Sequence, residues 1–167
     1  MAQTMFRKII FIFIVFIGLC GFVTQEIPET IGQPLDERQA QESLPQAKDD
    51  MWKKLSQCKV VLDHKTYKYS IYYTPQLEAK KGKKITISGF MLPLEANEKF
   101  KHFLLSKRTP TCSFCPPGEP NEIIEVFTKN PITWDEGIVT MTGEFVFANK
   151  DELGIFFQLK DAYQEKP

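Results

Sequence analysis

Six apolar-rich stretches beyond residue 65 predict β-strands, and several of them alternate apolar with polar residues, the period of two that is typical of strands. These stretches are residues 67–73, 85–92, 100–105, 122–127, 138–147 and 155–159. The apolar spacing in the third stretch also fits a short helix, so that stretch keeps two interpretations. After the fourth stretch, Asn130 and Pro131 are expected to break the chain, because proline cannot donate a ladder hydrogen bond.

Two of these stretches share a design with a glycine at the same place. Ile-Thr-Ile-Ser-Gly-Phe ends at Phe90, and Val-Thr-Met-Thr-Gly-Glu-Phe ends at Phe145. Gly89 and Gly143 therefore predict a bulge or a sharp bend in each strand, which is how a small barrel turns its corners. The sequence predicts a mainly β fold, a five- to six-stranded barrel of the oligonucleotide/oligosaccharide-binding (OB) type.

A short helix is predicted at the start of this domain. Asp49 or Asp50 can cap it, and Met51, Trp52 and Leu55 share one face at helical spacing. The folded domain is expected over residues 51–167.

The N-terminal pattern is different. Arg7 and Lys8 precede an uncharged apolar run over residues 9–23, the arrangement of a secretory signal. The run is shorter than the ~20 residues of a membrane-spanning helix, and its cleavage signature is weak, so residues 1–25 are a signal peptide or a membrane anchor. Cys20 would suit lipidation, but the preceding Leu19 is bulky where a small residue is expected.

The polar, proline-containing residues 26–50 show no apolar period and predict a disordered linker. The basic residues lie on the N-terminal side, so the rest of the chain is expected to face away from the cytoplasm, in the periplasm or outside the cell. Its expected partner is the membrane, reached through the N-terminal segment.

Charge argues against nucleic acid as a partner. The chain carries 21 basic and 21 acidic residues, and removal of the first 25 residues leaves 19 basic against 21 acidic. An acidic remainder does not attract a phosphate backbone.

The residues best suited to redox chemistry or metal binding lie in a proline-rich loop that holds Cys112 and Cys115. In an exported protein the simplest interpretation is a structural disulfide, although so short a ring is usually redox-active. Pro116 and Pro117 weaken a thioredoxin-like site, which needs a helix after the thiols. Pro116 also excludes covalent haem attachment, which needs a histidine there.

Metal binding is the remaining interpretation of this loop. Cys-x-x-Cys is a common half-site for Zn²⁺, and two soft thiolates alone can satisfy Cu(I). Cys112 and Cys115 are therefore predicted metal ligands, for Zn or Cu. Thiol–disulfide exchange and a purely structural loop in an interaction module are the alternatives.

Other residues offer less chemistry. Cys58 is expected in the core, His64 in a solvated loop and His102 hydrogen-bonded at the barrel margin, although Cys58 and His102 could be additional ligands. Glu119 and Glu122 could form a carboxylate pair but are expected in solvent. Two histidines and no catalytic motif leave no assigned catalytic residue, so a non-enzymatic role is expected.

Several blocks of the domain resemble a family of exported bacterial proteins known only as a domain of unknown function. The matching blocks are residues 89–95, 103–106, 110–118, 120–122 and 154–162. The Pro-Thr-Cys-x-x-Cys-Pro-Pro-Gly block is the most specific of them. The resemblance implies a periplasmic, often signal-bearing protein, and because members tend to be encoded near components of envelope ABC transporters, such components are its candidate partners. It implies no established activity.

Overall fold

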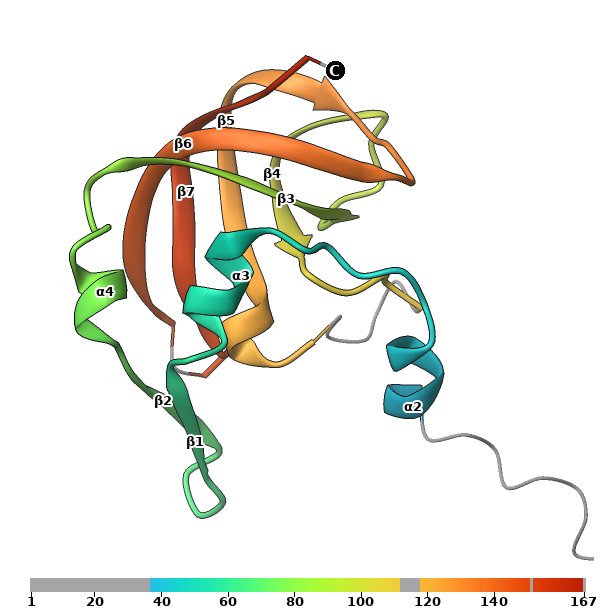
Figure 1. Cartoon of the computed structure of the whole chain (residues 1–167). Helices are drawn as coiled ribbons and strands as arrows, with labels where there is room; N and C mark the ends of the chain where they lie inside the picture. Colours follow the sequence, from blue (N-terminus) through green and yellow to red (C-terminus); the bar gives the residue numbers. More distant parts are fainter. Residues whose placement is uncertain (1–36, 112–117, 151, 167) are drawn as a thin grey trace, which may run out of the picture. The chain divides into compact units, whose positions relative to one another are not determined.

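Five of the six predicted stretches form long strands that close into a barrel, and the first forms a strand of a separate hairpin (Figure 1). The computed structural model describes residues 37–111, 118–150 and 152–166. The barrel strands are β3 (Lys84–Pro93), β4 (Lys99–Ser106), β5 (Ile123–Thr133), β6 (Ile138–Lys150) and β7 (Ile155–Gln164). The predicted mainly β barrel is confirmed, and its third stretch is a strand rather than a helix.

Neighbouring strands follow the order β3-β4-β5-β7-β6, and β6 returns to β3. Every pairing is antiparallel except that of β5 with β7, which is parallel. This is the Greek-key connectivity of a five-stranded OB barrel. Alternate residues of each strand fill the interior with aliphatic and aromatic side chains, the largest of them Phe103, Phe145 and Phe157.

Helix α3 (Asp50–Leu55) lies against the barrel, as the sequence predicts. Asp49 caps it by accepting a 2.8 Å hydrogen bond from the Met51 backbone, and Met51, Trp52 and Leu55 are buried. Burial of these three side chains fixes the helix on the strands beneath it. The other small elements are α2 (Glu37–Glu42), α4 (Pro75–Glu78), the 3-10 helix η1 (Pro120–Glu122), and a hairpin of β1 (Lys59–Asp63) and β2 (Lys68–Tyr72).

Three features differ from the sequence predictions. The hairpin strand β1 lacks a clear apolar period and was not predicted. Residues 37–50, assigned to the linker, contain α2 and contribute the buried side chain of Ala47.

The expected break at Pro131 is also wrong, because β5 continues to Thr133. Its pairing with β4 shifts register between Phe100 and His102, so the proline falls in the irregular part of the ladder. A bulge tolerates proline because no ladder hydrogen bond is required from its nitrogen.

The predicted N-terminal signal or anchor lies outside the described residues, as do residues 26–36. Among the helices that the structure describes, none combines the length and the apolarity needed to cross a bilayer.

Gly89 and Gly143 lie where the strands approach other backbone most closely. A Cβ at Gly89 would lie 2.7 Å from the Ser106 carbonyl oxygen, and one at Gly143 would lie 2.8 Å from the Lys160 carbonyl oxygen. Gly143 also coincides with a register shift between β6 and β7, which confirms the predicted irregularity there. Since the obstructing atoms are backbone, neither site has room for a side chain.

We therefore expect Gly89→Ala and Gly143→Ala each to lower the free energy of unfolding by about 2 kcal/mol or more, as overpacking does. Gly137→Ala is the matched control, because its Cβ would meet only the Asp135 side chain at 3.1 Å. Urea unfolding followed by circular dichroism measures all three. Equal effects at Gly89 and Gly137 would contradict the close-approach argument.

Candidate functional site

The predicted site residues Cys112 and Cys115 lie outside the described residues, but the structure describes both ends of the loop that carries them. The loop leaves the barrel after β4 and returns through η1 into β5. The residues on either side, 106–111 and 118–122, are here called the loop stem.

A buried ion pair joins the two sides of the stem. Arg108 Nε donates to Glu122 Oε2 at 2.7 Å and Nη2 donates to Glu122 Oε1 at 3.2 Å. Lys107 Nζ adds a third contact to Glu122 Oε1 at 3.0 Å. Glu122 is only 5% exposed, which contradicts the prediction that it lies in solvent. Bidentate, charge-assisted pairing of this kind fixes geometry as well as charge.

The protonation equilibria agree with this pairing. Burial raises the pKa of Glu122, but hydrogen bonds from Arg108 and Lys107 outweigh it, so the pKa lies below its usual value. The hydrogen bond to Glu122 raises the pKa of Arg108 in turn. Both groups are therefore charged at neutral pH, and the pair is an ion pair rather than a neutral contact.

Main-chain hydrogen bonds complete the stem. Lys107 N donates to Glu122 O at 3.0 Å and continues the β4–β5 ladder past the strand ends. The Ser106 hydroxyl donates to the Arg108 carbonyl at 2.9 Å and accepts from the Arg108 amide at 3.1 Å. Asn121 connects the stem to the residue before β1, because its Nδ2 donates a hydrogen bond to the Cys58 carbonyl oxygen at 3.0 Å.

The segment that contains α2 crosses the stem and is bonded to it. Ala47 N donates to Lys107 O at 2.8 Å, and the Thr109 hydroxyl donates to Pro45 O at 2.6 Å. Gln41 Nε2 donates to Thr109 O at 3.3 Å. The stem is therefore held by the barrel on one side and by residues 41–47 on the other.

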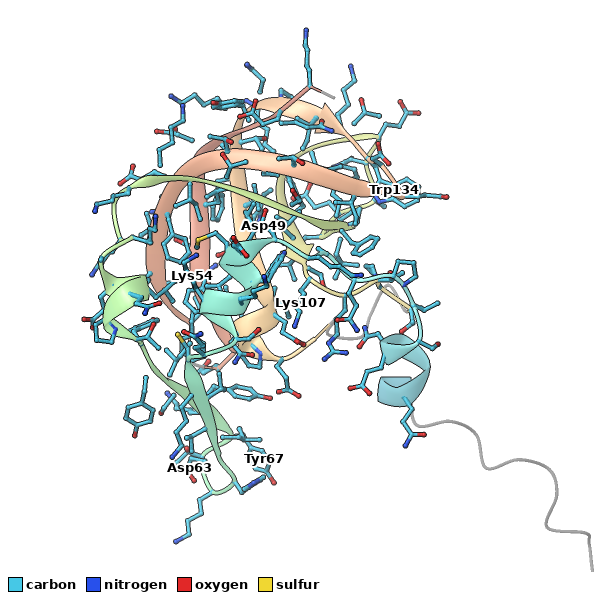
Figure 2. The ribbon with its side chains drawn as sticks, in the orientation of Figure 1. Asp49, Lys54, Asp63, Tyr67, Lys107 and Trp134 are labelled. Carbon is cyan, nitrogen blue, oxygen red and sulfur yellow. The ribbon has the colours of Figure 1, made fainter. Side chains whose placement is uncertain are left out.

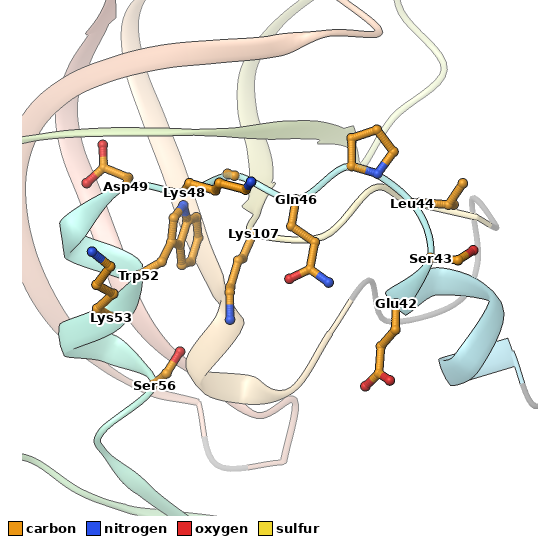
Figure 3. Close-up of a pocket in the computed structure, with 12 residues that line it drawn as sticks. Glu42, Ser43, Leu44, Gln46, Lys48, Asp49, Trp52, Lys53, Ser56 and Lys107 are labelled. Carbon is orange, nitrogen blue, oxygen red and sulfur yellow. The ribbon is translucent and has the colours of Figure 1, made fainter.

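A hollow of about 920 Å³ lies beside the stem, between α2 and α3 (Figure 3). Gln46 and Lys107 lie between the two helices, and the buried Trp52 forms part of the wall. The Lys107 ammonium already contacts Glu122, so this hollow and the ion pair share one side chain.

Arg108 keeps one unused donor. Its Nη1 atom is buried and has no hydrogen-bond partner among the described residues, and the Glu42 carboxylate oxygen Oε1 lies 3.7 Å away. The guanidinium is therefore oriented by Glu122 and only loosely approached by α2.

The remaining predicted candidates take the places expected of structural residues. Cys58 is 3% exposed in the core, and burial raises the pKa of its thiol. His64 is exposed in the turn between β1 and β2. Glu119 is exposed and precedes η1, so it does not form a buried carboxylate pair with Glu122.

His102 belongs to a second buried network, centred on Glu125, which the sequence analysis did not single out. Lys150 Nζ contacts the two Glu125 oxygens at 2.6 and 2.8 Å, and Gln158 Nε2 donates to Oε2 at 2.6 Å. His102 Nε2 lies 2.8 Å from Oε1 and its ring stacks on Phe127. The network links β4, β5, β6 and β7, and Glu125 is only 1% exposed.

A signal for this network was present in the sequence. Glu125 interrupts the apolar run of residues 123–127, and an isolated charge in a buried strand needs partners. Burial raises the pKa of Glu125, but hydrogen bonds from Lys150, Gln158 and His102 outweigh it and hold the pKa below its usual value. Among the described residues, no group of three or more His, Cys, Asp or Glu side chains could hold a metal ion.

Loss of one partner of the stem ion pair should be costly. We expect Arg108→Met and Glu122→Gln each to lower the free energy of unfolding by about 3 kcal/mol, because each leaves a buried charge without its bidentate partner. The double variant Arg108→Met/Glu122→Gln should cost less than the sum of the two single variants. The exposed pair of Lys53 and Asp50 is the control, and Lys53→Ala should leave stability unchanged. Strict additivity at the stem would contradict the coupling.

Both buried acids should make the fold sensitive to acid. Their pKa values are lowered in the folded state, so the unfolded chain binds more protons and stability falls as pH drops below about 4.5. Above that pH the contribution is fully present. Urea midpoints between pH 2.5 and pH 7 measure this effect, and Glu125→Gln should give a shallower slope below pH 4.5. An unchanged slope in that variant would show that Glu125 does not titrate with folding.

Comparisons with known proteins agree with the sequence resemblance. The family model described as "Protein of unknown function (DUF3299)" matches residues 26–153. The chain is also similar to a crystal structure of a DUF3299 family protein from Pseudomonas aeruginosa PAO1, with 20% identity over 74% of this chain and 85% of that chain and a TM-score of 0.46. No curated protein matches it. Because the family model matches more than half of its length, this chain belongs to the DUF3299 family, whose function is unknown.

Proposed function

We propose that this protein is an exported β-barrel module that binds a transition-metal ion through Cys112 and Cys115. In this proposal the barrel is a scaffold and performs no catalysis. The thiol pair is the functional group, and the membrane is reached through residues 1–25. A component of an envelope ABC transporter is the proposed partner.

The observation that carries the proposal is the construction of the loop stem. The buried pair of Arg108 and Glu122 fixes both ends of the loop, and the hydrogen bonds from residues 41–47 fix one of them again. A two-thiolate site gains affinity when its ligands are held in place before the metal arrives. A loop needed only as a connection would not require a bidentate ion pair at its base.

The ligand supply favours a site with few protein ligands. Cys58 is buried with a raised thiol pKa, and His102 is engaged with Glu125. Two soft thiolates satisfy Cu(I), whereas Zn²⁺ takes four ligands. Among the two metals expected from the sequence, Cu(I) therefore fits this chain better.

The test is metal analysis of the full chain, isolated with its co-purifying proteins from the cell envelope. We expect about one Cu or Zn per chain in the wild type and none in Cys112→Ser/Cys115→Ser. Cys58→Ser is the matched control and should retain the metal, since its thiol lies in the core. Bound metal should also raise the unfolding midpoint, and above the Kd the stabilisation should grow with the logarithm of the free metal concentration.

Three results would contradict parts of the proposal. Reduced thiols without stoichiometric metal would remove the metal site. A disulfide with a reduction potential above the structural range, about −300 mV, would instead favour thiol–disulfide exchange. Recovery of the protein from the cytosol, or an envelope preparation without transporter subunits, would remove the proposed location or partner.

A further inference from the structure

Three large apolar side chains are exposed where β3 ends, where β5 ends and where β6 begins. Leu94 follows β3, Trp134 follows β5, and Ile138 begins β6, with exposures of 46%, 46% and 49%. Ile138 pairs with Phe90 of β3, which brings the two strands together there. Figure 2 shows Trp134 at the margin of the barrel, apart from Lys54 of α3 and the capping residue Asp49.

Two hollows flank Trp134. One, of about 440 Å³, is lined by Pro93, Phe100 and Trp134, and the other, of about 410 Å³, is lined by Pro93, Leu92, Trp134 and the stem residues 109–111. Pro93 and Trp134 line both hollows, so the two hollows share these side chains. Leu94, Trp134, Ile138 and the two hollows are here called the Trp134 surface.

Carboxylates surround this surface. Glu95 and Glu98 line the first hollow and Glu136 lines the second, while Asp135 follows Trp134 directly. All four are exposed, and residues 93–99 and 133–138 contain a single basic residue, Lys99, which pairs with Thr133, so acids outnumber bases there. None of the four takes part in an ion pair within the part of the chain that the structure describes.

An exposed aromatic residue between two hollows, with a charged rim, has the composition of a protein-binding site. Large exposed apolar patches rimmed by polar residues mark interaction surfaces, and tryptophan is enriched among the residues that dominate binding energy. Rim charges of one sign then select partners of the opposite sign.

We propose that the Trp134 surface binds a segment of another protein in which a large apolar residue is flanked by Lys or Arg. The apolar residue enters a hollow beside Trp134, and the basic residues meet Glu95, Glu98 and Glu136. A second copy of this chain does not fit, because it would bring two sets of four carboxylates face to face. An anionic membrane surface is repelled for the same reason. The proposal does not depend on the thiol pair.

The first experiment is selection of random dodecapeptides displayed on phage against the purified full chain. The expected winners carry Phe, Trp or Leu within two positions of Lys or Arg. The best of them, synthesised with a fluorescent label, should bind at least tenfold more weakly to Trp134→Ser, as expected when a dominant aromatic contact is lost. Binding to Glu95→Gln/Glu98→Gln/Glu136→Gln should also weaken and lose most of its salt dependence.

Matched controls distinguish binding at the Trp134 surface from non-specific binding. Tyr72 is 63% exposed on the hairpin, and Glu144 is exposed on β6, so Tyr72→Gln and Glu144→Gln should bind the peptide as the wild type does. Peptide analogues with Glu in place of each basic residue should not bind. Cys112→Ser/Cys115→Ser should bind normally, which keeps this test independent of the metal site.

The proposal is overturned by any of three outcomes. The selection yields no peptide of the expected composition, or the peptide binds Trp134→Ser as tightly as the wild type. Alternatively, sedimentation shows that the wild type self-associates through this surface and that Trp134→Ser abolishes the association.

Discussion

The structure depends on close backbone contact at Gly89, where the barrel and the loop stem meet. The position of a Cβ at Gly89 would fall 2.7 Å from the Ser106 carbonyl and 3.2 Å from the Trp52 ring. The same two neighbours organise what lies outside the barrel. Trp52 anchors α3 through its 2.7 Å hydrogen bond to Ser88, and Ser106 begins the stem by bonding the main chain of Arg108. The packing around Gly89 therefore constrains the position of the stem, which begins at Ser106.

The barrel was predictable because its signals are local. Alternation and the paired glycines are read within ten residues, and Asp49 caps α3 within its own turn. The proline at position 131 misled the prediction, because whether a strand tolerates it depends on the register of β4 across the sheet. The helix α2 was missed for a related reason, since its contacts with Thr109 come from a segment far along the chain.

The sequence marks the loop that carries the candidate site, but it does not predict how the stem of that loop is built. The spacing of Cys112 and Cys115 marks the loop, yet nothing local shows that Glu122 is buried. Its partner Arg108 is 14 residues away, and the partners of Glu125 are 23 to 33 residues away. Acidic residues are usually exposed, so a sequence without its fold favours solvent for both. Only the folded barrel supplies the cations that make their burial possible.

The two buried acids and the four exposed acids have different roles in this protein. Glu122 and Glu125 each accept hydrogen bonds from charged donors, so their negative charge is neutralised inside the fold. These contacts help to hold the strands and the stem together. The carboxylates around Trp134 have no described ion-pair partner, so their field extends into solvent. A barrel that neutralises the acids it buries and leaves those around its exposed tryptophan without an ion-pair partner presents a fixed loop stem and, beside it, an apolar surface with a charged rim. The stem residues 109–111 line one hollow of that surface, so a partner bound there would contact the stem.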